Sequence, residues 1–190
     1  MRVLFLGIDG CAHPAGLLTR QSDDALARSL GALGYTVPAD LFVWLPLLIE
    51  MLEPHPDVFI VVHSSWRETY PAAEIGDMLG DLGPRYLGVT PPGPKWASIT
   101  TWLSKNTATS WRILDDAPRE FPDPPPLELI VCHPLAGLSA PEVQGQLNEW
   151  LNTSGASNTV PPRTVTAAIL ALPLKFKARV VPNVPRPRRR

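Results

Sequence analysis

Short apolar runs alternate with helical patterns along residues 1–152 of the chain. Strands are predicted from apolar runs at residues 3–6, 58–62, 86–89, 112–114 and 127–131. Helices are predicted from apolar positions at helical spacing over residues 23–33, 41–52, 72–82, 96–104 and 141–151. Short, nearly all-apolar strands separated by helices are typical of a parallel sheet covered on both faces. We therefore predict a doubly wound α/β domain with five parallel strands.

Residues 153–190 depart from this pattern and are predicted to be a linker and a basic, proline-containing tail, largely disordered. The segment NTSGASNTVPP, residues 152–162, has the composition of a flexible linker. The net charge of −1 hides an asymmetry, because eight of the 17 Lys and Arg residues and no acidic residue lie in the last thirty positions. The other 160 residues therefore carry a net charge of −9. The tail is either a solubilising extension or a contact for nucleic acid or anionic lipid.

Truncation after Asn158 tests this prediction for the tail. The only apolar run beyond that point, AAILALPL, is stopped by Pro173, so nothing else in the tail buries apolar surface. We expect the melting temperature of the truncated protein to match that of the full chain in a thermal unfolding experiment. A fall of many degrees would show that the tail packs on the domain.

Composition favours a soluble globular protein, and we predict a cytoplasmic location. Hydrophobic residues make up 45% of the chain and charged residues 18%. No apolar run approaches the roughly 20 residues of a membrane span, and no small-residue cleavage site follows the first strand. Cys11 and Cys132 are the only cysteines and form no CxxC pair, so neither a zinc site nor a disulfide framework is expected.

Polar residues gather where the predicted strands end, which is where parallel sheets bind ligands. Strand one runs into Gly7-Ile8-Asp9-Gly10, strand two into His63-Ser64-Ser65-Trp66-Arg67, and strand four into Asp115-Asp116. Lys95 opens the helix before strand four. Hydroxyls, a lysine and three carboxylates are therefore predicted to meet at one edge of the sheet.

These segments together resemble the haloacid dehalogenase (HAD) superfamily, and more narrowly the HAD-like domain of some multidomain RNA repair proteins. The matching pieces occur in the family's order: FLGIDGCAHP, VVHSSWR, PGPKWASITTWL, WRILDD and PLAGLS. They extend from residue 3 to about residue 151. The resemblance implies a three-layer, Rossmann-like fold with strand one between strands two and four, and little or no cap over the site.

The resemblance also implies a role for each residue at the sheet edge. In the family, strand one ends in Asp-x-Asp-Gly, with the first Asp as nucleophile and the second as general acid/base. Gly7 stands at the nucleophile position, and Asp9 matches the second Asp. Ser64, or Ser65 if the strand end shifts by one residue, matches the phosphate-binding hydroxyl. Lys95 matches the cation that neutralises the phosphoryl group.

The magnesium site of the family maps onto three aspartates. Asp115 and Asp116 match the acidic pair, and the backbone carbonyl of Asp9 would be a third ligand. This chemistry fits the oxygen ligands and near-octahedral geometry that Mg²⁺ prefers. Since Gly7 offers neither a nucleophile nor a ligand, binding of Mg²⁺ is expected to be weak or absent. Arg67 is a further candidate for phosphate binding.

Each of these residues also has a plain structural interpretation. The glycine-flanked Asp9 fits a strand-to-helix turn, and Ser64 fits a helix cap. Asp115 fits an Asx turn, while Lys95 and Arg67 fit solvated surface cations. His13 and His63 flank the predicted site, but the four histidines share no metal-ligand spacing.

We predict a HAD-like, phosphatase-type hydrolase domain that is impaired or inactive because Gly7 replaces the nucleophile. The alternative is a non-catalytic module that binds a phosphorylated ligand, a nucleic-acid end or a protein partner. The expected partner is a phosphorylated small molecule or a nucleic-acid end, which an uncapped site would admit. If only the nucleophile is missing, Gly7→Asp should restore magnesium-dependent hydrolysis unless Gly7 has a positive φ.

The same topology predicts that Cys11 and Cys132 are not bonded to each other. They follow strands one and five, which strand four separates. Their backbones should then lie about 10 Å apart, two strand spacings, which is too far for a disulfide.

Overall fold

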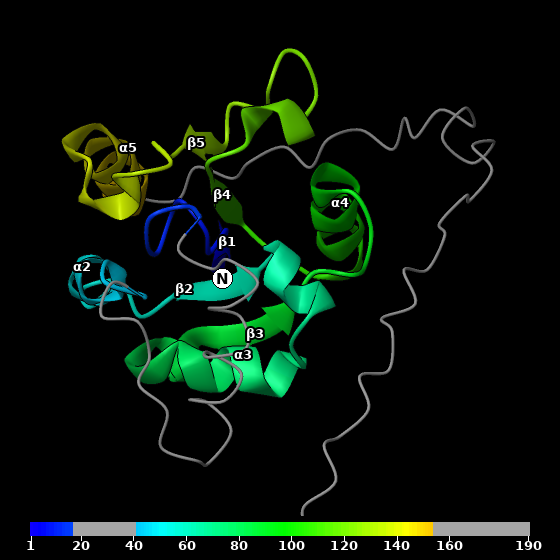
Figure 1. Cartoon of the computed structure of the whole chain (residues 1–190), viewed down its shortest axis with the longest axis horizontal. Helices are drawn as coiled ribbons and strands as arrows, with labels where there is room; N and C mark the ends of the chain where they lie inside the picture. The colour runs from blue at the N-terminus through cyan, green and yellow to red at the C-terminus, as the bar shows by residue number, and fades with distance from the viewer. Residues whose placement is uncertain (17–40, 154–190) are drawn as a thin grey trace, which may run out of the picture. The chain divides into compact units, whose positions relative to one another are not determined.

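The five predicted strands form one parallel sheet with the order β3-β2-β1-β4-β5 (Figure 1). The computed structural model describes residues 1–16 and 41–153. The strands are β1 (Arg2–Leu6), β2 (Val58–Val62), β3 (Tyr86–Val89), β4 (Ser110–Asp115) and β5 (Leu129–Val131). The central place of β1 between β2 and β4 confirms the predicted topology, and the predicted α/β class is confirmed as well.

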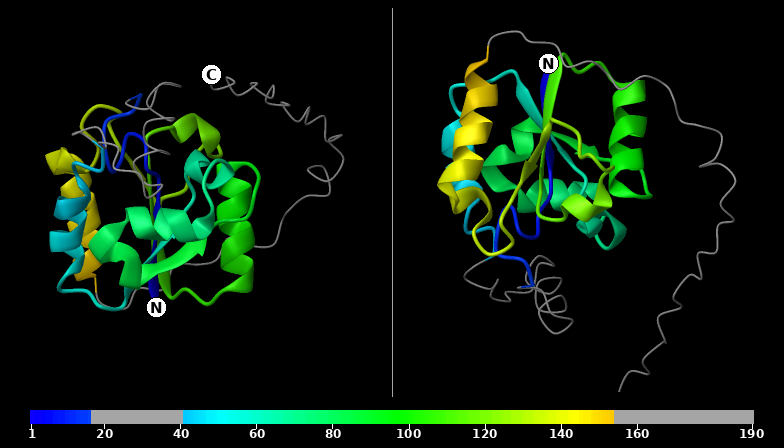
Figure 2. Two further views of the ribbon diagram at one scale, coloured as in Figure 1. Left: turned by 60° about the horizontal axis from the view of Figure 1, so that its bottom comes forward. Right: turned by 90° about the horizontal axis from the view of Figure 1, so that it is seen from above.

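Helices cover both faces of the sheet, which lies edge-on between them in the right-hand view of Figure 2. One face is covered by α2 (Leu45–Leu52), α3 (Ala72–Met78) and α5 (Pro141–Asn152), and the other by α4 (Lys95–Lys105). The central strand shows why both layers are needed. Leu4 and Leu6 pack in the core on the α2 side, while Val3 and Phe5 pack in the core on the α4 side.

The helix predicted over residues 41–52 begins four residues later than expected, at Leu45. Phe42 has a positive φ of 56°, which no α-helical residue adopts. Pro46 then lies in the first turn of α2, where its missing N–H leaves no helical hydrogen bond unmade. The apolar pattern correctly predicted a helix in this segment, but the conformation of Phe42 prevents the helix from starting before Leu45.

The helix predicted over residues 72–82 is also shorter, because α3 ends at Met78. Gly80 has a positive φ of 55°, which ends the α-helical geometry. The chain continues as a 3₁₀ helix, η2 (Gly80–Arg85), which includes Pro84. Leu79 and Leu82 are both fully buried, so the apolar spacing continues from α3 into η2. The hydrophobic pattern alone therefore did not show where the α-helix ends.

Cys11 and Cys132 are not disulfide-bonded, as predicted, and both are buried. Burial first, and then the neighbouring thiol of Cys132, raises the pKa of Cys11. Cys132 directly follows β5, and its N–H donates to the carbonyl of Asp115 at 2.9 Å, which continues the pairing of β5 with β4.

Three predictions lie outside the described residues: the helix over residues 23–33, the small size of any cap, and the tail over residues 154–190. Within the described residues, no helix is long and apolar enough to cross a membrane.

Candidate functional site

The ends of the central strands are in register, which brings the predicted site residues to one level. Leu6, the last residue of β1, pairs with Val62 of β2 and with Leu114 of β4. Gly7, His63 and Asp115 directly follow these three paired residues and therefore lie at the same level of the sheet edge. The candidate site is formed around these three positions.

Gly7 is packed so closely against β4 that no side chain fits there. Its N–H donates to the carbonyl oxygen of Leu114 at 2.8 Å. A Cβ added to Gly7 would lie 2.8 Å from that same oxygen, 3.3 Å from Asp115 Oδ2 and 3.4 Å from Cys11 Sγ. Its φ is not in the left-handed region, so the constraint comes from the neighbouring backbone and not from the conformation of the glycine.

Asp115 lies at the centre of a buried hydrogen-bond network. Lys95 Nζ donates to Oδ1 at 3.0 Å and to Oδ2 at 2.8 Å. His63 Nε2 lies 2.8 Å from Oδ2, and the N–H of Ala117 donates to Oδ1 at 2.8 Å. Two carboxylate oxygens offer about four lone-pair positions, and these four contacts occupy them.

The charges of this network follow from burial and pairing. Burial alone would raise the pKa of Asp115, but the hydrogen bond of His63, together with the charge and hydrogen bonds of Lys95, lowers it to about 2. Burial opposes the charge of Lys95, but Asp115 outweighs it and the pKa of Lys95 is raised. Burial lowers the pKa of His63 despite the contact with Asp115. At neutral pH the site therefore holds a charged Lys95–Asp115 pair beside a neutral imidazole.

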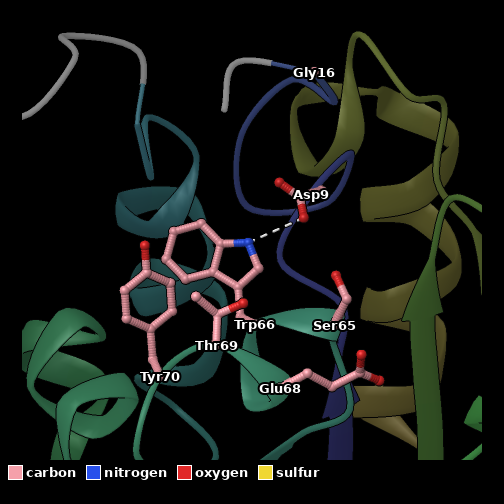
Figure 3. A pocket seen from close by; sticks show the side chains of 7 residues that line it. All are labelled: Asp9, Gly16, Ser65, Trp66, Glu68, Thr69 and Tyr70. Carbon is pink, nitrogen blue, oxygen red and sulfur yellow. Dashed lines mark hydrogen bonds between the residues drawn. The ribbon is translucent and has the colours of Figure 1, made fainter. Parts of the chain in front are cut away.

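Asp9 is held by two N–H donors. His13 Nε2 lies 3.1 Å from Oδ1, and Trp66 Nε1 donates to Oδ2 at 3.0 Å, as Figure 3 shows for the indole. The N–H of Phe42 donates to His13 Nδ1, which leaves Nε2 as the protonated nitrogen that faces Asp9. Both donors are buried, while the Asp9 side chain is 35% exposed. The carboxylate is thus fixed in orientation and open to a ligand.

Asp116 packs against the second glycine of the strand-one motif. Gly10 has a φ of 68°, and a Cβ there would overlap the Asp116 carboxylate. Burial first, and then the nearby charge of Asp115, raise the pKa of Asp116, with a smaller contribution from Asp9. The three predicted carboxylates therefore do lie close enough to act on one another.

Ser64 follows β2 by two residues and caps the short 3₁₀ helix η1 (Ser65–Glu68), which contains Ser65 and Arg67. Ser64 Oγ accepts the N–H of Trp66 at 3.4 Å, which is the capping role considered from the sequence, and Ser65 is exposed. The guanidinium of Arg67 donates to the carbonyls of His63, of Ser64 at 2.8 Å and of Gly93 at 2.7 Å. Arg67 therefore braces the end of β2 against the loop before α4, and its use in phosphate binding remains a prediction.

The arrangement does not fit the predicted magnesium site. Mg²⁺ needs oxygen ligands with free lone pairs in octahedral geometry, but those of Asp115 are occupied and Gly7 supplies none. Among the described residues, no group of three His, Cys, Asp or Glu side chains is placed to hold a metal ion.

Sequence reasoning gave too little weight to three buried residues. His13, His63 and Trp66 were given no role in the predicted site, but each contacts a site carboxylate. Their positions carried a signal, because His63 ends the second strand and His13 follows Asp9 by one turn. A buried imidazole or indole N–H needs an acceptor, and the nearest ones are these carboxylates.

A comparison with known families finds one match across most of the described chain. The model described as the HAD domain in Swiss Army Knife RNA repair proteins matches residues 3–143. This range contains β2 to β5, all of β1 except Arg2, and every candidate site residue. No curated protein and no solved structure matches the chain. The resemblance predicted from the motifs is confirmed.

Proposed function

The chain belongs to the family of HAD domains in Swiss Army Knife RNA repair proteins, and from this premise we propose that it binds phosphorylated nucleic-acid ends without cleaving them. The domain is of the HAD-like, phosphatase-type hydrolase class. The proposal adds two statements to this class: that catalysis is lost, and that the ligand is a phosphorylated nucleic-acid end. Both are argued from the side chains that occupy the site in this chain.

The packing around Gly7 carries the proposal. Phosphoryl transfer through an enzyme-bound intermediate needs a nucleophile, and Gly7 stands where the family places it. The space that its Cβ would need is closed by the Leu114 carbonyl at 2.8 Å. The site is therefore built around the glycine, and no other carboxylate takes its place on β1.

The remaining groups suit binding better than turnover. Asp9 can exchange a proton with a leaving oxygen, but a proton donor alone does not form a phosphoenzyme. The Lys95 side chain is 15% exposed, and its ammonium already pairs with Asp115 at 2.8 Å and with Glu120 at 3.5 Å. The exposed hydroxyl of Ser65 and the partly accessible Lys95 side chain are the donors available to a phosphate, while Ser64 is buried.

Two measurements on the full chain test the proposal. With p-nitrophenyl phosphate, we expect hydrolysis at the buffer rate with and without added Mg²⁺. In fluorescence anisotropy, an RNA oligonucleotide with a terminal phosphate should bind about ten-fold more tightly than the same oligonucleotide with hydroxyl ends. One oligonucleotide carries the phosphate at the 5′ end and another at the 3′ end.

A variant separates the phosphate site from general affinity for RNA. Ser65→Ala should reduce the preference for the phosphorylated end, while Ser104→Ala, an exposed serine on α4, should leave it unchanged. Rapid magnesium-dependent hydrolysis by the wild-type chain would overturn the loss of catalysis. Equal binding of phosphorylated and hydroxyl ends would overturn the phosphate site.

A further inference from the structure

A cavity of about 370 Å³ opens beside Asp9 and follows η1 (Figure 3). Its polar side chains are Asp9, Ser65, Glu68 and Thr69, and its aromatic wall is formed by Trp66 and Tyr70. Asp9 and Ser65 are shared by this cavity and the proposed phosphate site. A ligand whose phosphate lies at that site would therefore have its next chemical group in the cavity.

We propose that this cavity binds the nucleoside of the terminal nucleotide, an inference that rests on the proposed function and names its ligand more closely. Its volume lies at the small end of the range for small-molecule pockets, about 300–1,000 Å³. That space suits one nucleoside and not a longer piece of chain. The rest of a nucleic acid would leave the domain through the open side.

The charge of the lining excludes a second phosphate. Two carboxylates, those of Asp9 and Glu68, line the cavity, and no Lys or Arg does among the described lining residues. Arg67 lies between two lining residues in the sequence, yet its guanidinium is bound to carbonyls of β2 and the α4 loop. An uncharged group with hydroxyl or amino donors, such as a ribose or a base edge, matches these acceptors.

The aromatic wall provides a surface for a base. Trp66 is buried and is fixed by its hydrogen bond to Asp9, so its indole supports the wall from behind. The half-buried ring of Tyr70 lies against it with a centroid distance of 5.2 Å and an interplanar angle of 39°. A base that stacks on Tyr70 would gain affinity without sequence preference.

Isothermal titration calorimetry on the full chain tests the inference with four probes: inorganic phosphate, adenosine 5′-monophosphate, adenosine 3′-monophosphate and adenosine 5′-diphosphate. We expect at least one monophosphate to bind ten-fold or more tightly than inorganic phosphate. The diphosphate should bind more weakly than the 5′-monophosphate, because its added charge faces Glu68. Tyr70→Leu and Glu68→Gln should each remove most of the advantage of the monophosphate and leave the affinity for inorganic phosphate unchanged.

Two controls keep the result specific. Tyr70→Phe retains the ring and should keep the advantage, and Glu142→Gln removes an exposed carboxylate on α5 and should have no effect. Equal affinities for phosphate and both monophosphates would overturn the inference and leave the phosphate site standing. An advantage that survives both Tyr70→Leu and Glu68→Gln would also overturn it. Absence of binding by every probe would overturn the proposed function, and the inference with it.

Discussion

Gly7→Asp is expected to leave the chain without phosphatase activity and to lower its melting temperature by several degrees. The new Cβ would meet the Leu114 carbonyl at 2.8 Å, and a backbone atom in the middle of a sheet cannot move aside cheaply. Overpacking of this kind costs about 1–3 kcal/mol. For a domain of this size, each kcal/mol corresponds to about 2–4 °C in melting temperature. Differential scanning calorimetry and the p-nitrophenyl phosphate assay with Mg²⁺ measure the two effects.

Gly7→Ala is the matched control, because it adds the same Cβ without a carboxylate. It should lose a similar number of degrees, which would assign the loss to the contact with Leu114. A second carboxylate beside Asp115 adds repulsion in Gly7→Asp alone. Magnesium-dependent hydrolysis by Gly7→Asp and not by Gly7→Ala would contradict this prediction and show that only the nucleophile is missing.

The sequence alone predicted that Gly7→Asp would restore magnesium-dependent hydrolysis, whereas the structure predicts no activity. From the sequence, the foreseeable obstacle at Gly7 was a positive φ, and the structure has none there. The actual obstacle is the Leu114 carbonyl, which depends on how closely β1 and β4 approach beyond their last paired residues. Local sequence cannot report a contact between residues that are about one hundred positions apart.

The fold itself was largely predictable, because its determinants are local. Each buried strand is a nearly continuous apolar run, and the edge that collects polar residues follows from parallel strand direction. Lys95 and Asp115 were correctly placed at that edge. Their pairing with each other and with His63 was not predicted, since it depends on where α4 starts relative to the end of β4.

Lys95→Met is expected to be the most destabilising single change in the site. Asp115 is 1% exposed and keeps its charge through Lys95 and His63, so removing the ammonium leaves a buried carboxylate without its main counter-charge. Breaking one side of a buried ion pair costs about 3–5 kcal/mol. Urea unfolding at pH 7 should show this loss. Lys105→Met, at an exposed lysine on the same helix, should change stability by about 0.5 kcal/mol or less.

A double variant shows whether the loss comes from the unpaired carboxylate. Lys95→Met with Asp115→Leu should recover much of the stability, because no buried charge then remains. If Lys95→Met is as stable as Lys105→Met, the Lys95–Asp115 pair contributes little and the site is better hydrated than its burial implies. That result would return Asp115 to the candidates for a metal ligand.

The same network sets the response of the wild-type protein to acid. The pKa of Asp115 is lowered from 3.8 to about 2 in the folded chain, so the folded state holds the ionised form more strongly than the unfolded state does. This stabilisation is present above about pH 4 and is lost as the pH falls toward 2. A difference of this size corresponds to about 2 kcal/mol. In Lys95→Met, the part of that difference that comes from the ammonium is absent, while the hydrogen bond of His63 to Asp115 remains. Its urea midpoint should therefore fall less steeply than that of the wild type between pH 4 and pH 2, and parallel curves would mean that His63 alone keeps Asp115 ionised.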